Sequence, residues 1–431
     1  MSAEPTRPGT STTPAVPGAA APPDPRRWWI LAVIGLAQLM VVLDATIVNI
    51  ALPSAQAGLG FSDDQRQWVV TAYAITFGSL LLLGGRLADL FGRRRAFLVG
   101  QIGFAAASAL GGAAATFGVL VTARALQGVF AALLAPAALS LLTITFSAPT
   151  ERAKAFGVFG ALAASGGAVG LLLGGFLTEH LSWRSTMYVN LLFAAVAVTG
   201  AVLLLKRPAP TTPPRLDLPG TVLASSGLFC LVYGLATAGP RGWESAHTLG
   251  FLVASGLLLA VFVWWQRRSA HPLLPLRIVL DRVRGTALAS VFITGVGMFG
   301  VFLFLTYYLQ HARGYSPALT GLAFMPMSCC TMISAIGSNT GLLGRIGGRP
   351  RIVTGMLLSA CGMAWLSTLT ATGAYVVDVL PGQVATGLGM GLITAAAMNL
   401  GTAGIDPRDA GVGAPPRKPP QPHRAARRPP P

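Results

Sequence analysis

The sequence predicts an all-α protein that crosses a membrane about twelve times, and three observations support this fold class. Hydrophobic residues make up 53% of the 431-residue chain and charged residues only 10%, whereas a soluble domain carries about 25% charged residues. About twelve apolar segments, each long enough to span the hydrocarbon core as a helix, follow one another. Lysine and arginine gather at the two ends and in alternate loops, the pattern that orients membrane proteins.

The first segment begins directly after Arg26 and Arg27 and is too long for the apolar part of a cleavable signal peptide, so we interpret it as a span. Residues 1–26, rich in Pro, Ala, Thr and Ser, are expected to form a disordered tail. An even number of spans and the placement of the basic residues predict that both termini are cytoplasmic. The spans are predicted at residues 28–52, 67–88, 96–115, 117–142, 155–178, 186–205, 218–239, 248–266, 285–310, 319–343, 350–372 and 376–403.

Several function classes are disfavoured by composition and motifs. The net charge of +17 does not indicate nucleic acid binding, because no basic face is interleaved with aromatic residues that would stack on bases. No Gly-Lys-Ser/Thr phosphate loop occurs, which argues against ATP-driven pumping. The five histidines are scattered, so we expect no metal centre, and neither a cofactor nor an enzyme activity is suggested. The four cysteines lie in predicted spans and are interpreted as small apolar residues: Cys230, Cys329, Cys330 and Cys361.

One carboxylate lies inside the first predicted span. Asp44 is near the middle of an apolar run from Trp28 to Leu52. A charged residue at this depth costs roughly 2.5–3.5 kcal/mol on insertion scales, so such residues usually have a function. Because removal from water favours the neutral form of a carboxylate, we expect Asp44 to bind a proton from one side and release it to the other. The alternative is a structural aspartate that internal hydrogen bonds satisfy.

Arg124 is the arginine placed well inside a predicted span. A buried guanidinium needs a partner, and the sequence leaves open whether that partner is Asp44 or backbone carbonyl groups. A further alternative is snorkelling, because Arg124 lies roughly eight residues from the start of its span and a long side chain can reach the interface.

Two short, basic, glycine-bearing loops suggest an internal repeat. GGRLADLFGRRR, at 84–95, lies between spans two and three, and GLLGRIGGRPR, at 341–351, lies between spans ten and eleven. Two related halves with a substrate site between them are a recurring transporter design. We therefore expect a six-span bundle at 27–206, two extra central spans at 207–268 and an incomplete four-span bundle at 269–405, followed by a Pro/Arg-rich tail at 406–431.

Four motifs, in order along the chain, resemble those of the fourteen-span drug:proton antiporters of the major facilitator superfamily. The resemblance covers the chain from about Arg27 to Val412. The motifs are LDATIVNIALP at 43–53 in the first span, GRLADLFGRRR at 85–95 in the following loop, LVTARALQG at 120–128 in the fourth span, and YYLQHARGYSP at 307–317 at the ninth span.

The resemblance implies the major facilitator fold and a monomeric transporter in the bacterial inner membrane. It would bind protons and export drugs or other small molecules that are lipophilic or cationic. It implies that Asp44 and Arg124 take part in proton coupling. A cytoplasmic latch is implied for Gly85, Asp89, Gly92, Arg93 and Arg94, although positive-charge anchoring alone would also explain the arginines.

Further polar residues are candidates for lining a cavity. For the two tyrosines among them, anchoring at the membrane interface is the alternative. These candidates are Gln38, Asn49, Gln127, Tyr307, Tyr308 and Gln310.

Two features depart from the family pattern. The fifth-span motif, Gly-Pro-x-x-Gly-Gly, keeps Gly170, Gly174 and Gly175, but Leu171 replaces its proline. The direction of transport is therefore less secure than the coupling, and a proton-coupled uptake symporter is the alternative. The resemblance also implies two more spans after Val412, so we expect a truncated or frame-shifted C-terminus that could leave the transporter inactive; a native disordered tail is the alternative.

Overall fold

Helices make up nearly all of the computed structural model, which describes residues 25–146, 148–205, 217–269, 282–338, 347–370 and 373–402. No strand occurs in these ranges. The elements in chain order are α1 (Arg27–Leu59), α2 (Asp63–Phe91), α3 (Arg93–Gly112), α4 (Phe117–Thr145), α5 (Pro149–His180), α6 (Ser185–Leu204), α7 (Leu218–Arg241), α8 (Ala246–Arg268), α10 (Arg282–Tyr307), the π-helix η1 (Tyr308–Ala312), α11 (Pro317–Ala323), α12 (Met325–Gly337), α14 (Gly348–Leu366), the π-helix η2 (Tyr375–Val379) and α15 (Leu380–Thr402).

These elements correspond one by one to the predicted spans, when α10 is taken with η1, α11 with α12, and η2 with α15. Within the described ranges, nine helical segments are long and apolar enough to cross a membrane. The other three spans correspond to α3, α5 and α14. The all-α polytopic fold class is confirmed.

The first helix extends further than predicted. The sequence suggested an end at Leu52, before Pro53, but α1 passes through Pro53 to Leu59. It ends where Gly60 adopts φ +68° and donates its N–H to the carbonyl of Gln56, a left-handed cap that glycine adopts without steric cost. The proline is accommodated within the helix because only one backbone hydrogen bond is lost there.

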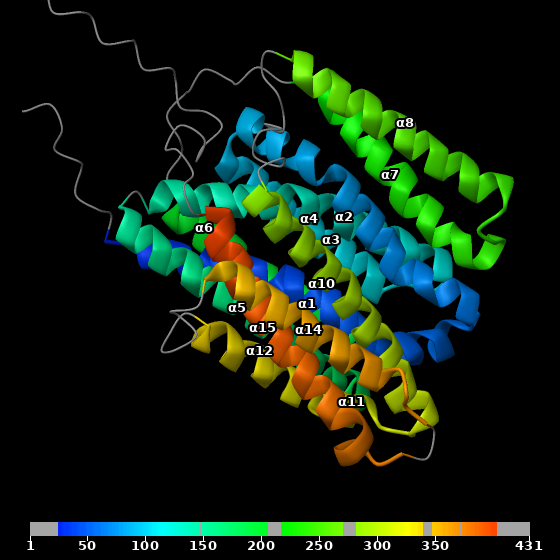
Figure 1. Cartoon of the computed structure of the whole chain (residues 1–431). Coiled ribbons are helices and arrows are strands. Elements are labelled where there is room, and N and C mark those ends of the chain that lie inside the picture. Colours follow the sequence, from blue (N-terminus) through cyan, green and yellow to red (C-terminus); the bar gives the residue numbers. More distant parts are fainter. Residues whose placement is uncertain are drawn as a thin grey trace, which may run out of the picture.

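Helices α1 to α6 form an N-terminal bundle around a core of aliphatic and aromatic side chains (Figure 1). In this bundle α2 and α3 both pack on α4, and α5 packs on α1. A Cβ atom on Gly84 would collide with the carbonyl of Ala132, and one on Gly100 would lie 3.0 Å from the Cβ of Leu134. Small residues at these crossings let the backbones approach, which is how helices pack tightly in lipid.

Helices α7 and α8 form a hairpin whose main neighbour is α2 (Figure 1). Asp217 caps α7 through the N–H of Gly220 and also accepts hydrogen bonds from Trp265 and Gln266 of α8, at 2.7 and 2.8 Å. Near the other end of the hairpin, the ring of Tyr233 lies 5.9 Å from that of Trp68 of α2. The hairpin is thus fixed internally and docked on the N-terminal bundle.

Helices α10 to α15 form a second bundle in which α15 packs against α10, α12 and α14. Two π-helical turns, η1 and η2, interrupt the regular hydrogen bonding at one end of this bundle. Such turns are rare and are often found at functional sites. The predicted domain boundaries at 206 and 405, the tail 406–431, most of the tail 1–26 and most of the second basic loop lie outside the described residues.

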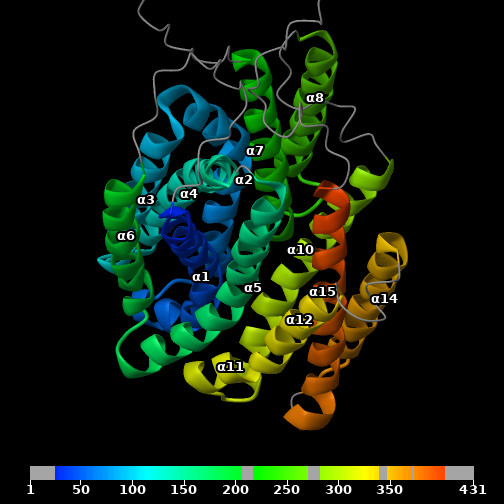
Figure 2. The same ribbon diagram turned by 90° about the vertical axis from the view of Figure 1, so that its left-hand side faces the viewer.

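The two bundles contact each other at one end of the molecule. We call the end that carries the α2–α3 connection at Gly92 the basic end, and the end that carries the α1–α2 connection at Gly60 and helix α11 the opposite end (Figure 2). At the opposite end, α5 packs against α11, and α1 lies next to α10. The amide of Gln310 donates to the carbonyl of Ile50 at 3.2 Å, and the N–H of Ala318 donates to Glu179 at 3.0 Å.

Glycine makes the closest of these contacts feasible. A Cβ atom on Gly175 of α5 would collide with the backbone of Pro317, and one on Gly321 of α11 would collide with the carbonyl of Leu171. We expect Gly175→Val to hold the bundles apart at this end, because the valine side chain has no space against a backbone carbonyl. In a chain that also carries Ala318→Cys, a membrane-impermeant maleimide supplied on the side of the opposite end should then label the new cysteine faster.

A matched control is Gly167→Val, since a Cβ atom at Gly167 meets nothing within 4 Å. Equal labelling rates in Gly175→Val and Gly167→Val would contradict the assignment of Gly175 to a closed contact.

Candidate functional site

Asp44 and Arg124 form a buried ion pair between α1 and α4. Arg124 Nη1 lies 2.6 Å from Asp44 Oδ2, and neither residue is exposed to solvent. The two charges compensate each other, which is the condition under which a low-dielectric core tolerates them. The two charged residues that the sequence placed inside predicted spans therefore lie together in one site of the N-terminal bundle.

Neutral side chains complete the cluster around this pair. Gln127 Nε2 and Asn190 Nδ2 both donate to Asp44 Oδ1, at 2.9 and 2.7 Å. The same two amides donate to Ser108 Oγ, at 2.7 and 3.2 Å. Gln127 Oε1 in turn accepts a hydrogen bond of 2.7 Å from Arg124. Helices α1, α3, α4 and α6 thus each contribute to one closed, buried polar network.

Arg124 also holds the α2 backbone. Its Nε donates to the carbonyl of Val69 at 3.1 Å, and its guanidinium carbon lies 4.6 Å above the ring of Tyr73. Both partners left open by the sequence, Asp44 and a backbone carbonyl, are therefore used at once. The snorkelling alternative does not describe Arg124, which has no exposed surface.

The cluster can exchange a proton without losing its framework. If Asp44 is protonated, Gln127 and Asn190 can still donate to its carboxyl oxygen, while Arg124 keeps Gln127, Val69 and Tyr73 as partners. Removing one partner of a buried pair usually costs about 3–5 kcal/mol, so these secondary contacts reduce the penalty of the neutral state. The arrangement is suited to storing and releasing one proton.

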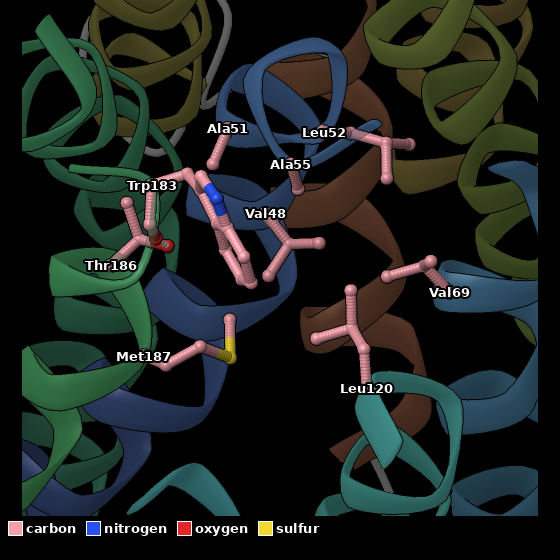
Figure 3. Close-up of a pocket in the computed structure, with 9 residues that line it drawn as sticks. All are labelled: Val48, Ala51, Leu52, Ala55, Val69, Leu120, Trp183, Thr186 and Met187. Atoms are coloured by element: carbon pink, nitrogen blue, oxygen red, sulfur yellow. Dashed lines mark hydrogen bonds between the residues drawn. The ribbon is translucent and has the colours of Figure 1, made fainter. Parts of the chain in front are cut away.

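A small cavity lies next to the cluster, on its side toward the opposite end (Figure 3). Its volume is about 10 Å³, roughly the space for one water molecule. Its lining is apolar apart from Thr186, whose hydroxyl already donates to the carbonyl of Trp183. Such an apolar pocket holds water poorly, and Asp44 itself has no exposed surface. The residues around the cavity are Val48, Ala51, Leu52, Ala55, Val69, Leu120, Trp183, Thr186 and Met187.

The remaining polar candidates of α1 lie on a different face of the helix from Asp44. Gln38 and Asn49 are about three turns apart and so share one face, whereas Asp44 points into the bundle core. Gln38 is half-buried and Asn49 is buried, with its Oδ1 lacking a partner among the described residues. Gln127, predicted to line a cavity, lies instead within the Asp44 cluster.

The candidates at the ninth span lie at the contact between the bundles. The guanidinium of Arg66 on α2 stacks 4.3 Å above the ring of Tyr307, and Gln310 reaches Ile50 of α1. Tyr308 donates its hydroxyl to the carbonyl of Thr370 within the second bundle, at 2.6 Å. Two of these three candidates thus join the bundles at the opposite end.

The loop at Gly85–Arg94 makes its contacts within the N-terminal bundle. Arg93 lies 3.5 Å from Asp89, and Arg94 donates to the carbonyl of Val202 on α6 at 3.2 Å. Gly92 has φ +88°, which only glycine adopts readily, and forms the sharp turn into α3. Gly85 lies on α2 facing Pro136. A latch between the bundles remains a prediction; the contacts described for Asp89, Arg93 and Arg94 lie within the N-terminal bundle.

The glycines of the fifth span line a surface between α1 and α11. Cβ atoms on Gly170 and Gly174 would collide with or crowd Thr46 and Ile47 of α1, while Gly175 faces α11. Leu171, which stands where the fifth-span motif has proline, leaves this packing intact. Its side chain is fully buried against the second bundle.

Sequence reasoning missed Ser108, Asn190 and Tyr73. A signal existed, because polar side chains in membrane spans usually face partners inside the bundle. The spans contain many serines, threonines and asparagines, however, and their hydroxyl groups are often satisfied by their own helix. The sequence could not distinguish the residues that meet Asp44 from the others.

The comparisons with known proteins agree with this fold. A family model described as Major Facilitator Superfamily matches residues 34–414. The puromycin resistance protein pur8 of Streptomyces alboniger is 50% identical over 410 residues, which cover 95% of this chain and 81% of that protein. The cephamycin export protein CmcT of Amycolatopsis lactamdurans is 38% identical over 384 residues, covering 87% of this chain and 78% of that protein.

Among solved structures, a peptide transporter POT in complex with sulfate is similar with a TM-score of 0.60 and 16% identity, covering 87% of each chain. A bacterial homologue of the lysosomal transporter Spinster, in an inward-facing and unoccupied conformation, gives a TM-score of 0.55 and 18% identity, covering 90% of this chain and 77% of that chain. At these identities the similarity concerns the fold.

Proposed function

Because this chain belongs to the Major Facilitator Superfamily, we propose that it exports an antibiotic or a related small molecule from a bacterial cell in exchange for protons. The observation that carries the exchange is the buried cluster of Asp44 and Arg124, a titratable group in the core of the bundle with a framework of hydrogen bonds around it. The names of relatives at 50% and 38% identity support antibiotics as the substrate class.

In this proposal, Asp44 binds a proton from the outside and releases it to the cytoplasm, and the two bundles rock between these states. The contacts between bundles at the opposite end, through Gln310, Glu179 and Tyr307, close the outer side when the basic end faces the cytoplasm. One charge moved across 100 mV is worth about 2.3 kcal/mol, which would sustain roughly a fifty-fold substrate gradient. The protein would act as a monomer in the inner membrane with both termini cytoplasmic.

Puromycin is the first substrate to test, because the relative with 50% identity is named for resistance to it. Cells that express the full chain should tolerate more puromycin than cells with an empty vector. Cephamycin should be tested in parallel, since another relative is named for its export.

Everted membrane vesicles test the exchange directly. After respiration has acidified the lumen, adding the exported drug should raise the lumenal pH, because each drug molecule that enters is exchanged for a proton that leaves. A proton-coupled uptake symporter would change the lumenal pH in the other direction when the drug enters. Resistance without any drug-dependent pH change would contradict proton coupling and leave only export.

A further inference from the structure

One helical turn of α2 connects the buried ion pair to the contact between the two bundles. Arg66 precedes Val69 by three residues, so the two residues lie about 4.5 Å apart along the helix axis. The carbonyl of Val69 accepts the hydrogen bond of 3.1 Å from Arg124 Nε. The guanidinium of Arg66 lies 4.3 Å from the centre of the Tyr307 ring on α10. The same turn therefore contacts the ion-pair site and the second bundle.

The Tyr307 ring is a main partner of the Arg66 cation. The Arg66 side chain is 18% exposed, and its Nη1 lies 3.8 Å from Asp63 Oδ1, too far for a hydrogen bond. Asp63 is 71% exposed, so water screens its attraction to Arg66. A cation that is largely removed from water gains more from an aromatic face than an exposed one. The stacking of Arg66 on Tyr307 therefore helps to hold α10 against α2.

Neighbouring turns of α10 and η1 support this contact. Leu303, one turn before Tyr307, packs against a buried cluster that contains Val69. On the following turn, Gln310 donates to the carbonyl of Ile50 at 3.2 Å. Residues spaced by four and three positions share one helix face, so this face of α10 and η1 rests on the N-terminal bundle. A displacement of the Val69 turn would disturb it.

The position of Arg124 depends on a titratable partner. Arg124 Nη1 lies 2.6 Å from Asp44 Oδ2, while its Nε donates to Val69. With Asp44 ionised, this charge-assisted bond fixes the guanidinium in the orientation that directs Nε at α2. A neutral carboxyl group is a weaker acceptor, because the attraction between opposite charges is lost. The charge of Asp44 therefore controls how firmly Arg124 holds the Val69 turn.

Other titratable side chains lie at both contacts. The ring of Tyr73 lies 4.6 Å from the Arg124 guanidinium, beside the ion pair. At the other contact, Asp63 flanks Arg66, and the exposed His311 stacks on Tyr307 with 4.4 Å between ring centres. Histidine is the side chain that changes charge between about pH 5 and 8. A change of pH would therefore act on both contacts at once, whereas substitution of Asp44 acts on one.

We propose that Arg66 is the residue through which the charge of Asp44 determines whether the bundles touch at the opposite end. Ionised Asp44 fixes Arg124, which in turn fixes the Val69 turn of α2. Arg66, on that turn, keeps Tyr307 of the second bundle in contact. When Asp44 binds a proton, the first of these contacts weakens and the bundles separate at the opposite end.

Arg66 is thus a positioning residue, because it acts through Tyr307 and does not touch Asp44. That a proton on Asp44 is the natural trigger rests on the proposed function. The mechanical link between the ion pair and the Arg66–Tyr307 contact does not.

Spin labels can measure the separation of the bundles at the opposite end. Asp64→Cys on α2 and Ala312→Cys on η1 provide exposed positions for them, in the full chain in liposomes with its four native cysteines replaced by alanine. Tyr307→Leu removes the ring from Arg66, so the ratio of separated to touching molecules should rise about tenfold, as expected for a largely buried cation–π contact. Tyr307→Phe keeps the ring and should leave the ratio unchanged.

Asp44→Asn should raise the same ratio, although Asp44 does not touch the labelled helices at their ends. Arg124→Lys should do so as well, because lysine keeps a cation for Asp44 but loses the Nε hydrogen bond to Val69. This second variant tests the link even where Asp44→Asn does not fold. Asp44→Asn combined with Tyr307→Leu should raise the ratio little beyond Tyr307→Leu alone, since effects within one connected network are not additive.

Tyr308→Leu is the matched control. Tyr308 is the neighbouring tyrosine, but its hydroxyl donates to the carbonyl of Thr370 within the second bundle, so its loss should leave the ratio unchanged. Equal rises in Tyr307→Leu and Tyr308→Leu would overturn the role of Arg66. An unchanged ratio in Arg124→Lys, or fully additive effects of Asp44→Asn and Tyr307→Leu, would overturn the link. Separation in Asp44→Asn, with wild-type vesicles that move drug but no protons, would support the link and refute the proposed function.

Discussion

Asp44→Asn is expected to abolish proton-driven export. The substitution keeps the size of the side chain, and its amide oxygen can still accept from Gln127 and Asn190, but its NH2 group cannot accept from Arg124 and the titratable group at the centre of the cluster is removed. Groups that transfer protons typically contribute 10²-fold or more to rate, so drug-dependent pH change in vesicles should fall on the order of 100-fold. Resistance of whole cells should fall to that of the empty vector.

Asp217→Asn is the control for this experiment. Asp217 is also a buried aspartate that accepts several hydrogen bonds, but it lies in the α7–α8 hairpin at the basic end. Its neutralisation should weaken the hairpin without stopping proton exchange. Normal proton-driven export by Asp44→Asn would remove the coupling role from Asp44 and leave it a structural residue.

Arg124→Gln is expected to have the largest effect on stability. The variant leaves the Asp44 carboxylate buried without a cation, and breaking a buried pair in this way costs about 3–5 kcal/mol. It also removes the hydrogen bond to Val69 that links α4 to α2. Thermal unfolding in detergent should occur at a clearly lower temperature, and proton-driven transport should be lost because the cluster around Asp44 no longer holds its cation.

The double variant Asp44→Asn with Arg124→Gln separates the two effects. Removing both charges eliminates the unpaired ion, so the double variant should be more stable than Arg124→Gln alone. The full cycle of wild type, both single variants and the double variant gives the coupling energy of the pair. Transport should not return, because no titratable group is restored. A double variant that is no more stable than Arg124→Gln would show that the lost Val69 contact, rather than the ion pair, determines stability.

The sequence predicted the number and order of the helices because each span is a long apolar segment with clear polar ends. It placed the end of the first span at Leu52, where the apolar run stops, whereas α1 continues through Pro53 to Leu59. The π-helical turns η1 and η2 were not predicted, because a one-residue change in hydrogen-bond spacing leaves no pattern in the sequence.

The sequence predicted the two charged residues of the candidate site but not the neutral side chains that surround them. Asp44 and Arg124 could be found because charged residues inside spans are rare and require each other. Ser108 and Asn190 could not, because their importance depends on how α3 and α6 are rotated against α1. The sequence grouped Gln38 and Asn49 with Gln127 as cavity-lining candidates, because it does not show how the helices are rotated. In the structure Gln127 contacts Asp44, whereas Gln38 and Asn49 lie on another face of α1.

The attachment of the α7–α8 hairpin determines how motion in this protein can be measured. Asp217 fixes α7 to α8, and the pair rests mainly on α2. We therefore expect the hairpin to move as one rigid body with α1 to α6 when the two bundles rock against each other. The distance between spin labels on α8 and α3 should therefore stay constant and serve as a reference. A change in the distance between labels on α8 and α14 would then measure the movement of one bundle relative to the other.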